Sequence, residues 1–260
     1  MLSCLHLVMF TVPCSLCFGS LPLWRHYVHS SQLFPHMSPL PLITSCVLIC
    51  FNCFHLVTTT TEKNEIVNKH NTLRRNVQPT ASNMLKMNWS NEAEANAQRW
   101  ANTCSMKHSP ATSGCGENLY YSSFQNTWSN AIQSWYNEVK DFSYGVGSTN
   151  GGVVGHYTQV VWYRSNQIGC AMAYCPNSKY KYFYVCHYCP PGNYQLTQPY
   201  KKGPSCGDCP NACENNLCTN PCPFSDKYSN CPQLKQQWGC NHPDVASWCP
   251  ASCKCTNQII

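Results

Sequence analysis

The cysteines are the residues of this chain whose number and spacing bear most directly on chemistry. The 260 residues include 22 cysteines, far above the share that a cytosolic protein carries. Two pairs, Cys186-x-x-Cys189 and Cys206-x-x-Cys209, are separated by sixteen residues, a spacing that fits a zinc-ribbon site. The alternative is a framework of disulfides formed in an oxidising compartment.

Three features of the chain favour disulfides over a zinc ribbon. A secretion signal is predicted, a border between domains falls between the two pairs, and twelve further cysteines of the mature chain would still need partners. The cysteines form three groups: six in Met1–Cys53, six in Cys104–Cys189 and ten in Cys206–Cys255. If the first group leaves with the signal, sixteen remain, an even number that suits eight disulfides.

Residues 1–61 differ in composition from everything that follows. They contain no acidic residue and one basic residue, Arg25, whereas the rest carries 16 basic and 11 acidic residues. The apolar run Leu40–Val57 has the length of a signal-peptide core and predicts a cleaved signal and an extracellular protein. Because a signal peptide lies at the N-terminus, we predict that translation starts at Met37. The alternative is a signal-anchor helix, but a run interrupted by proline and asparagine is marginal for a stable membrane span.

Other recognisable catalytic patterns are missing from the sequence. There is no GxSxG around a serine and no HExxH, and Gly145–Gly155 matches neither a phosphate loop nor a dinucleotide fingerprint. The mature region has a net charge of about +5, with scattered basic residues, which argues against nucleic acid as a partner. Asn88-Trp89-Ser90 is a glycosylation sequon and predicts a glycan on Asn88.

Hydrophobic periodicity predicts three helices followed by three strands. The helices are expected at Lys63–Val77, Ser90–Cys104 and Thr127–Val139, and the strands at Tyr157–Tyr163, Ile168–Tyr174 and Lys181–His187. Helices gathered before strands predict an α+β domain over residues 62–195, in which helices pack on an antiparallel sheet.

The chain changes character after this domain. Residues 196–221 are predicted to form a hinge, and residues 222–260 a small cysteine-rich domain. So short a segment cannot bury enough apolar area to offset a chain entropy of about 1.5 kcal/mol per residue. Disulfides, worth roughly 2–4 kcal/mol each, must supply the difference.

Four stretches, taken together and in order, resemble the CAP superfamily. They are His70-Asn71-Thr72-Leu73-Arg74, Gly116-Glu117-Asn118-Leu119, Gly155-His156-Tyr157-Thr158-Gln159-Val160-Val161-Trp162 and Phe183-Tyr184-Val185-Cys186-His187-Tyr188-Cys189-Pro190-Pro191-Gly192-Asn193. With the ten-cysteine tail, the chain resembles the cysteine-rich secretory proteins over essentially all of Glu62–Ile260. The resemblance implies an α-β-α sandwich joined by a hinge to a compact helical domain rich in disulfides.

The resemblance also implies a cleft that contains His108, Glu117, Glu138 and His156. Two imidazoles and two carboxylates suit Zn²⁺, with the histidines as direct ligands and the glutamates orienting them or a bound water. The alternative is a hydrogen-bonded polar cluster without metal. The loop between His108 and Cys115 is shorter than in relatives, so the placement of His108 is the point at issue.

Two further histidines lie inside the motifs. His70 is expected to be a structural residue of the core, because it lies on the apolar face of the first helix. His187 stands where relatives often carry a different polar residue. Neither is predicted to belong to the metal site.

The disulfide pairing is likewise an implication of the resemblance and leaves no cysteine as a nucleophile. The expected pairs are Cys104 with Cys175, Cys115 with Cys189, Cys170 with Cys186, Cys206 with Cys213, Cys209 with Cys218, Cys222 with Cys255, Cys231 with Cys249, and Cys240 with Cys253.

Three functions follow as hypotheses. The first is a secreted, non-enzymatic binding protein that modulates an ion channel or interacts with a cell surface or gamete, its tail presenting Lys227, Lys235 or Lys254 near Phe224, Tyr228 and Trp238. The second is a metal-dependent hydrolase with Glu117 or Glu138 as general base. The third is a sterol or lipid carrier with a groove near Tyr144-Gly145-Val146.

Overall fold

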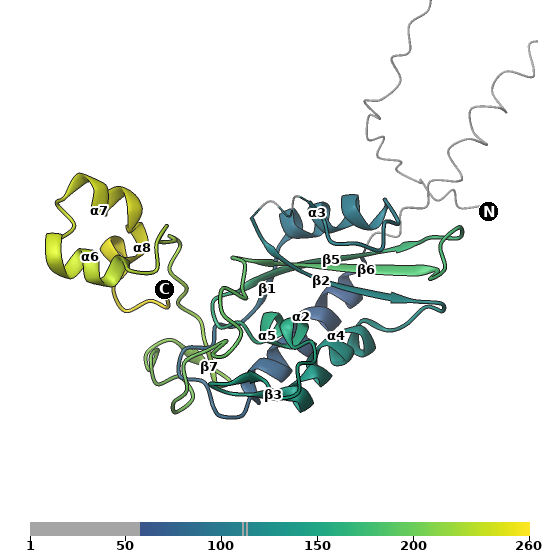
Figure 1. Ribbon diagram of the computed structural model, residues 1–260, viewed down its shortest axis with the longest axis horizontal. Coiled ribbons are helices and arrows are strands. Elements are labelled where there is room, and N and C mark those ends of the chain that lie inside the picture. Colours follow the sequence, from purple (N-terminus) through teal and green to yellow (C-terminus); the bar gives the residue numbers. More distant parts are fainter. Residues whose placement is uncertain (1–57, 111, 113) are drawn as a thin grey trace, which may run out of the picture. The chain divides into compact units, whose positions relative to one another are not determined.

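The computed structural model describes residues 58–110, 112 and 114–260. The predicted signal segment and Met37 lie outside the described residues. The described part contains a sandwich of helices and sheet, a hinge and a helical tail (Figure 1). The hinge carries two disulfides. The expected α+β class is confirmed.

The sandwich is built around a four-stranded sheet with the strand order β1-β5-β6-β2. Strand β1 pairs parallel to β5, and the other pairs are antiparallel. Strand β2 therefore lies at one edge of the sheet. The bounds are Asn88–Trp89 for β1, Gly116–Ser122 for β2, Gln167–Tyr174 for β5 and Tyr182–Cys189 for β6.

Helix α3 (Asn91–Ala101) covers one face of the sheet. Its buried alanines, Ala97 and Ala101, pack against apolar side chains of β5 and β6. The helix approaches β5 so closely that a Cβ atom on Gly169 would lie 2.0 Å from the backbone nitrogen of Glu94. Only glycine fits this contact.

The opposite face is covered by α2 (Thr60–Arg75), α4 (Trp128–Tyr136) and α5 (Gly155–Val160). Because side chains alternate along a strand, Ile168, Cys170 and Met172 of β5 all point into this larger core. A short 3-10 helix, η1 (Asn137–Asp141), and the paired strands β3 (Phe142–Ser143) and β4 (Gly147–Ser148) follow α4.

Helix α2 begins before the expected domain start at residue 62. The side chain of Thr59 caps the helix by accepting the backbone N–H of Glu62, whose carboxylate in turn accepts the backbone N–H of Thr59. The buried hydroxyl of Thr58 donates to Cys170 O at 2.9 Å. The threonines at the border of the predicted leader therefore belong to the folded domain.

Two expectations about secondary structure are wrong. Residues 157–160, expected in a strand, belong to α5, and residues 161–163 lie outside any strand or helix. The expected order, with all helices before the strands, is also wrong, because strand β2 precedes helix α4. The segment of α5 is rich in β-branched and aromatic residues, but contacts from distant parts of the chain hold both of its ends in a helix.

A hinge of two disulfides connects the sandwich to the tail. Strands β7 (Cys213–Glu214) and β8 (Leu217–Cys218) form a hairpin whose turn residues, Asn215 and Asn216, have the positive φ angles that such a tight turn requires. Cys218 forms a parallel bridge with Leu85 of the sandwich. The hinge thus packs on the sandwich rather than forming a free linker.

The tail contains three short helices: α6 (Cys231–Trp238), α7 (Pro243–Trp248) and α8 (Pro250–Lys254). Its small core consists of Cys231, Val245 and Cys249. The end of the chain returns to the hinge, where Ile259 N donates to Asn220 O and Ile259 O accepts from Cys222 N. Both ends of the tail are therefore held side by side.

The described residues form eight disulfides, in the pairing that the resemblance implies. Within residues 58–260, as far as they are described, no helix is long and apolar enough to cross a membrane.

Candidate functional site

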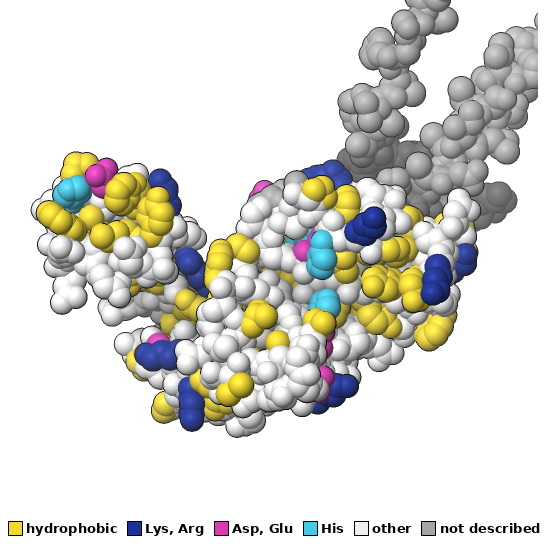
Figure 2. All heavy atoms as spheres, viewed as in Figure 1, with side chains coloured by type: hydrophobic (Ala, Val, Ile, Leu, Met, Phe, Trp, Pro, Cys, Tyr) yellow, Lys and Arg dark blue, Asp and Glu magenta, His cyan; other side chains and the backbone are white. Residues whose placement is uncertain are grey.

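A cavity of about 420 Å³ runs beside the edge strand β2. Histidine side chains gather on this face of the molecule, over β2 and α5 (Figure 2). The loop after α3 closes one side of the cavity, and α4, η1 and α5 close the other. His108, Glu138 and His156 all line it.

Glu117 on β2 orients His108. Glu117 Oε1 lies 2.7 Å from His108 Nδ1 and accepts the backbone N–H of Ser109 at 3.0 Å. Its other oxygen, Oε2, lies 2.9 Å from His187 Nε2. Burial alone would raise the pKa of the Glu117 carboxyl, but the hydrogen bonds from His187, Ser109 and His108 outweigh it and lower that pKa. Glu117 is therefore a carboxylate at neutral pH.

Glu138 of η1 orients His156 in the same way. Its Oε1 lies 2.6 Å from His156 Nδ1, and its Oε2 accepts the backbone N–H groups of His156 and Tyr157. These two groups belong to the first turn of α5, which has no cap from its own side chains. Glu138 thus caps α5 and fixes the imidazole that this helix carries.

The two glutamates leave one nitrogen of each imidazole, His108 Nε2 and His156 Nε2, available to bind a metal. In a neutral imidazole the ring nitrogen that faces a carboxylate carries the proton. In that form each Nδ1 donates and each Nε2 keeps a lone pair that a metal can bind. Within the described residues, neither His108 Nε2 nor His156 Nε2 has a hydrogen-bond partner. Carboxylate-oriented imidazoles of this kind are typical ligands of Zn²⁺.

A buried hydrogen-bond network supports the site from below. Asn118 Nδ2 donates to His156 O at 3.1 Å and lies 3.4 Å from the hydroxyl of Tyr188. That hydroxyl is 3.0 Å from His70 Nε2, while His70 Nδ1 lies 2.8 Å from Ile66 O. Burial lowers the pKa of His70 to about 3, so the ring is neutral and structural, as expected.

Of the four residues that the sequence predicts for the cleft, His108, Glu138 and His156 line the cavity. Glu117 lies behind His108 rather than on the cavity wall. The shortened loop does not displace His108, because Glu117 binds both its ring and the next backbone N–H. His187 was not predicted to take part; its pairing opposite Glu117 in the β2–β6 register becomes visible only when the strands are paired.

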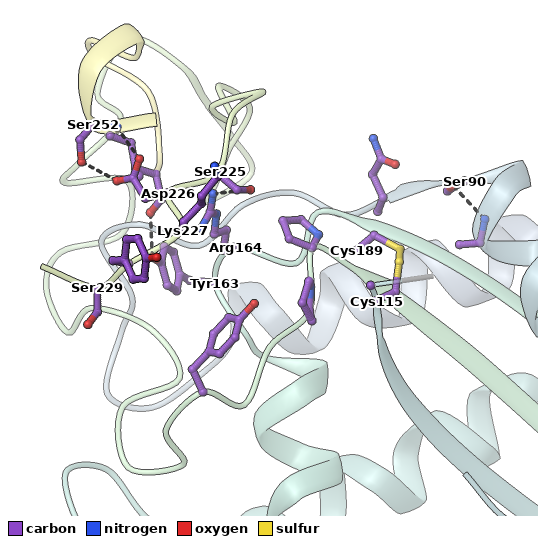
Figure 3. A pocket seen from close by; sticks show the side chains of 18 of the residues that line it. Ser90, Cys115, Tyr163, Arg164, Cys189, Ser225, Asp226, Lys227, Ser229 and Ser252 are labelled. Carbon is purple, nitrogen blue, oxygen red and sulfur yellow. Dashed lines mark hydrogen bonds between the residues drawn. A yellow bond between two sulfur atoms is a disulfide. The ribbon is translucent and has the colours of Figure 1, made fainter. Parts of the chain in front are cut away.

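A larger cavity of about 1140 Å³ lies where the tail meets the sandwich. Figure 3 shows Arg164 close to Ser225 in its wall, and Asp226 directed at Ser252. The carboxylate of Asp226 accepts the backbone N–H groups of Ala251 and Ser252. These polar groups are hydrogen-bonded to one another. The described residues that line this cavity include no histidine.

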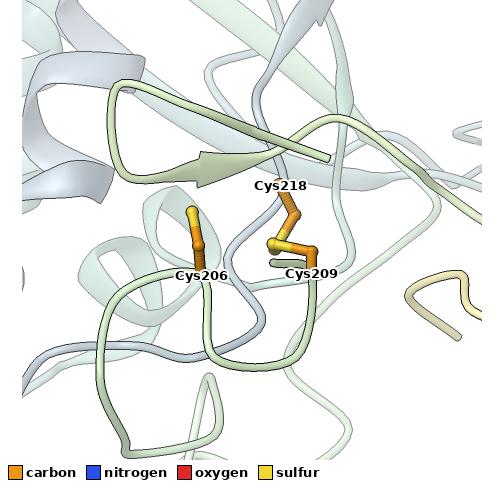
Figure 4. A group of neighbouring side chains, drawn as sticks. All are labelled: Cys206, Cys209 and Cys218. Atoms are coloured by element: carbon orange, nitrogen blue, oxygen red, sulfur yellow. A yellow bond between two sulfur atoms is a disulfide. The ribbon is translucent and has the colours of Figure 1, made fainter. Parts of the chain in front are cut away.

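The sixteen cysteines of the described residues form no thiolate site, because all are in disulfides. The sulfur atoms of Cys206, Cys209 and Cys218 lie within 4.8 Å of one another. Figure 4 shows Cys206 beside the disulfide of Cys209 and Cys218. Each belongs to a disulfide, Cys206 with Cys213 and Cys209 with Cys218. The zinc-ribbon alternative therefore has no free ligands.

Comparisons with known proteins agree with this architecture. Residues 67–188 match the model described as the cysteine-rich secretory protein family, and residues 206–260 match the model named Crisp. The crystal structure of NaASP2 with Zn²⁺ is 30% identical with a TM-score of 0.54, covering 63% of this chain and 97% of that chain. BmVAL-1 is also 30% identical with a TM-score of 0.54, covering 62% and 95%.

A third solved structure, Na-ASP-1, is 32% identical with a TM-score of 0.54, and the match covers 64% of this chain and 49% of that chain. Both the sandwich and the tail thus have family counterparts. The chain belongs to the cysteine-rich secretory protein family.

Proposed function

We propose that the protein is a secreted, non-enzymatic binding protein whose tail engages an ion channel or another cell-surface partner. Family membership and eight disulfides support an extracellular location. The observation that carries the proposal is the surface of the tail. Lys254 Nζ lies 4.7 Å from the ring centre of Phe224, which is 38% exposed. A cation stacked on an exposed aromatic ring is a feature that a channel mouth can bind.

Further aromatic side chains extend this surface. Tyr228 and Trp248 pack edge to face and are both exposed, as is Trp238. Lys235 is different, because its Nζ donates to Ser252 O and so stabilises the tail itself. Of the three lysines that the sequence brought forward, Lys254 and Lys227 are the ones we expect to contact a partner.

Recording voltage-gated potassium currents in whole cells tests this proposal. The mature protein is expected to reduce the current, and Phe224→Ala with Lys254→Ala to abolish the reduction. Lys202→Ala is the matched control, because Lys202 is exposed and lies outside the tail. Two results would count against the proposed surface. One is a current that the wild-type protein does not change, and the other is a current that the Phe224→Ala/Lys254→Ala variant reduces as much as the Lys202→Ala control does.

We further propose that the cleft binds Zn²⁺ through His108 Nε2 and His156 Nε2, with Glu117 and Glu138 orienting the rings. The support is the geometry described above and the Zn²⁺ named for NaASP2. A bound Zn²⁺ would supply a Lewis acid or a structural bridge between the two sides of the cleft.

The arrangement favours binding over hydrolysis. Glu117 and Glu138 each accept three hydrogen bonds from protein groups. Because a carboxylate has about four acceptor sites, little capacity is left on either side chain to take a proton from a water. The lipid-carrier alternative has less support, because Tyr144, Gly145 and Val146 line neither of the two cavities described above. The hydroxyl of Tyr144 instead donates to Tyr200 O within the fold.

A further inference from the structure

His187 is a buried histidine in contact with the cleft. It lies on β6 directly opposite Glu117 of β2, and 1% of its side chain is exposed. Its Nε2 faces Glu117 Oε2 at 2.9 Å. Its Nδ1 is buried and has no partner in the described part of the chain. The hydrogen bond to Glu117 is therefore the one polar contact that the described structure gives to this ring.

The two halves of the cleft are built on the same plan but anchored differently. Glu138 uses one oxygen for His156 and has the other fixed by two backbone N–H groups of α5. Glu117 uses one oxygen for His108 and Ser109 and has the other fixed by His187. His187 thus takes the place that a helix N-terminus has in the other half.

This anchor matters because His108 has little else to hold it. His108 lies on a loop, and 65% of its side chain is exposed, against 31% for His156 on α5. Few packing contacts restrict its ring, so its orientation depends on the hydrogen bond to Glu117. Without His187, the Glu117 carboxylate would be held by the backbone N–H of Ser109 and by His108 itself, both on one oxygen. The carboxylate could then turn about its last torsion and loosen its hold on His108 Nδ1.

We propose that His187 is a positioning residue of the cleft: it fixes the Glu117 carboxylate and thereby pre-orients His108 with Nε2 directed into the cavity. The proposal rests on the proposed zinc site for its functional consequence. The orienting step itself concerns the metal-free protein.

Two substitutions separate positioning from a merely structural role. His187→Gln keeps an N–H donor at a similar reach, whereas His187→Leu keeps the bulk and removes the donor. In the metal-free protein, the imidazole ¹⁵N shifts of His108 report its tautomer. We expect the Nδ1–H form in the wild type and in His187→Gln, and a mixture of tautomers in His187→Leu.

Zinc affinity is then measured by competition between each variant and a chromophoric chelator. We expect His187→Leu to weaken binding 10- to 100-fold, the usual effect of losing an outer-shell partner, and His187→Gln to restore it to within a few fold. Thermal unfolding of the metal-free proteins serves as the folding control. If His187→Leu does not fold, the comparison of His187→Gln with the wild type decides.

Two results would overturn the proposal. One is an unchanged tautomer of His108 in His187→Leu, and the other is a loss in His187→Gln as large as that in His187→Leu. If the wild type binds no zinc, the proposed metal function fails, while the tautomer measurement still decides whether His187 positions His108.

Discussion

Arg74 is a fully buried cation that fastens three segments of the sandwich together. Its guanidinium makes five hydrogen bonds to four backbone oxygens, those of Leu85, Val160, Trp162 and Tyr163. Burial lowers the pKa of this group to about 9, so it remains charged at neutral pH. Two of these oxygens belong to the chain just after α5, the helix that carries His156.

The cost of removing the guanidinium follows from which oxygens keep a partner. Trp162 O still accepts from Ser165 N, and Tyr163 O from Leu85 N. Leu85 O and Val160 O have no other partner among the described residues. Two buried carbonyls left unsatisfied cost about 1–3 kcal/mol each, so Arg74→Met should lower the free energy of unfolding by roughly 2–6 kcal/mol.

Urea unfolding with the disulfides intact measures this loss. For an m-value of about 2 kcal/mol/M, the midpoint should fall by roughly 1–3 M. Arg75→Met is the matched control, because the Arg75 side chain makes one hydrogen bond, to Asn71 O, at the partly exposed side of the same helix. A midpoint for Arg74→Met within about 0.5 M of that control would refute the reasoning.

Three further predictions concern other parts of the domain. The folded-state pKa of His70 lies at about 3, below its ordinary value of 6.5, so between these pH values the unfolded chain binds more protons than the folded protein. The free energy of unfolding should therefore fall as the pH drops from about 6.5 to about 3, by at most on the order of 4 kcal/mol. Urea midpoints measured across this pH range should fall less steeply for His70→Gln than for the wild type. Gly169→Ala should reduce the yield of folded protein or lower the melting temperature by more than 10 °C, because of the 2.0 Å approach of its Cβ to Glu94 N, and a melting temperature within about 2 °C of wild type would show that α3 moves away freely. Asn88 is exposed, so a glycan released by an N-glycosidase from the secreted wild type should be missing in Asn88→Gln, and equal masses before and after treatment would disprove occupancy.

The class of the fold and the pairing of the cysteines could be anticipated from the sequence because both depend on patterns local to the chain or shared with a family. Strand β2 could not be anticipated, because its polar residues break the hydrophobic pattern that predicts a strand. Glu117 and Asn118 interrupt the alternation expected of a strand, and both are used by the cleft. Functional residues are where local rules are expected to fail.

Helix α5 was missed for a related reason. Its β-branched and aromatic residues favour a strand. Glu138 supplies the acceptors for its first N–H groups, and Arg74 binds Val160 O near its end. Both partners are distant in sequence, so no window of local propensity contains them.

The role of His187 was hidden because it depends on strand register. A single sequence does not tell which residue of β2 faces which residue of β6. Once the register places His187 opposite Glu117, the contact follows directly.

Metal analysis of the mature protein tests the central claim about the cleft most directly. The wild type and a His108→Ala/His156→Ala double variant are dialysed against Zn²⁺ and then against metal-free buffer, with His242→Ala, a histidine of the tail, as control. We predict close to one Zn²⁺ per chain in the wild type and in the control, and close to none in the double variant. Equal zinc content in all three proteins, or none in the wild type, would contradict a zinc site made by His108 and His156.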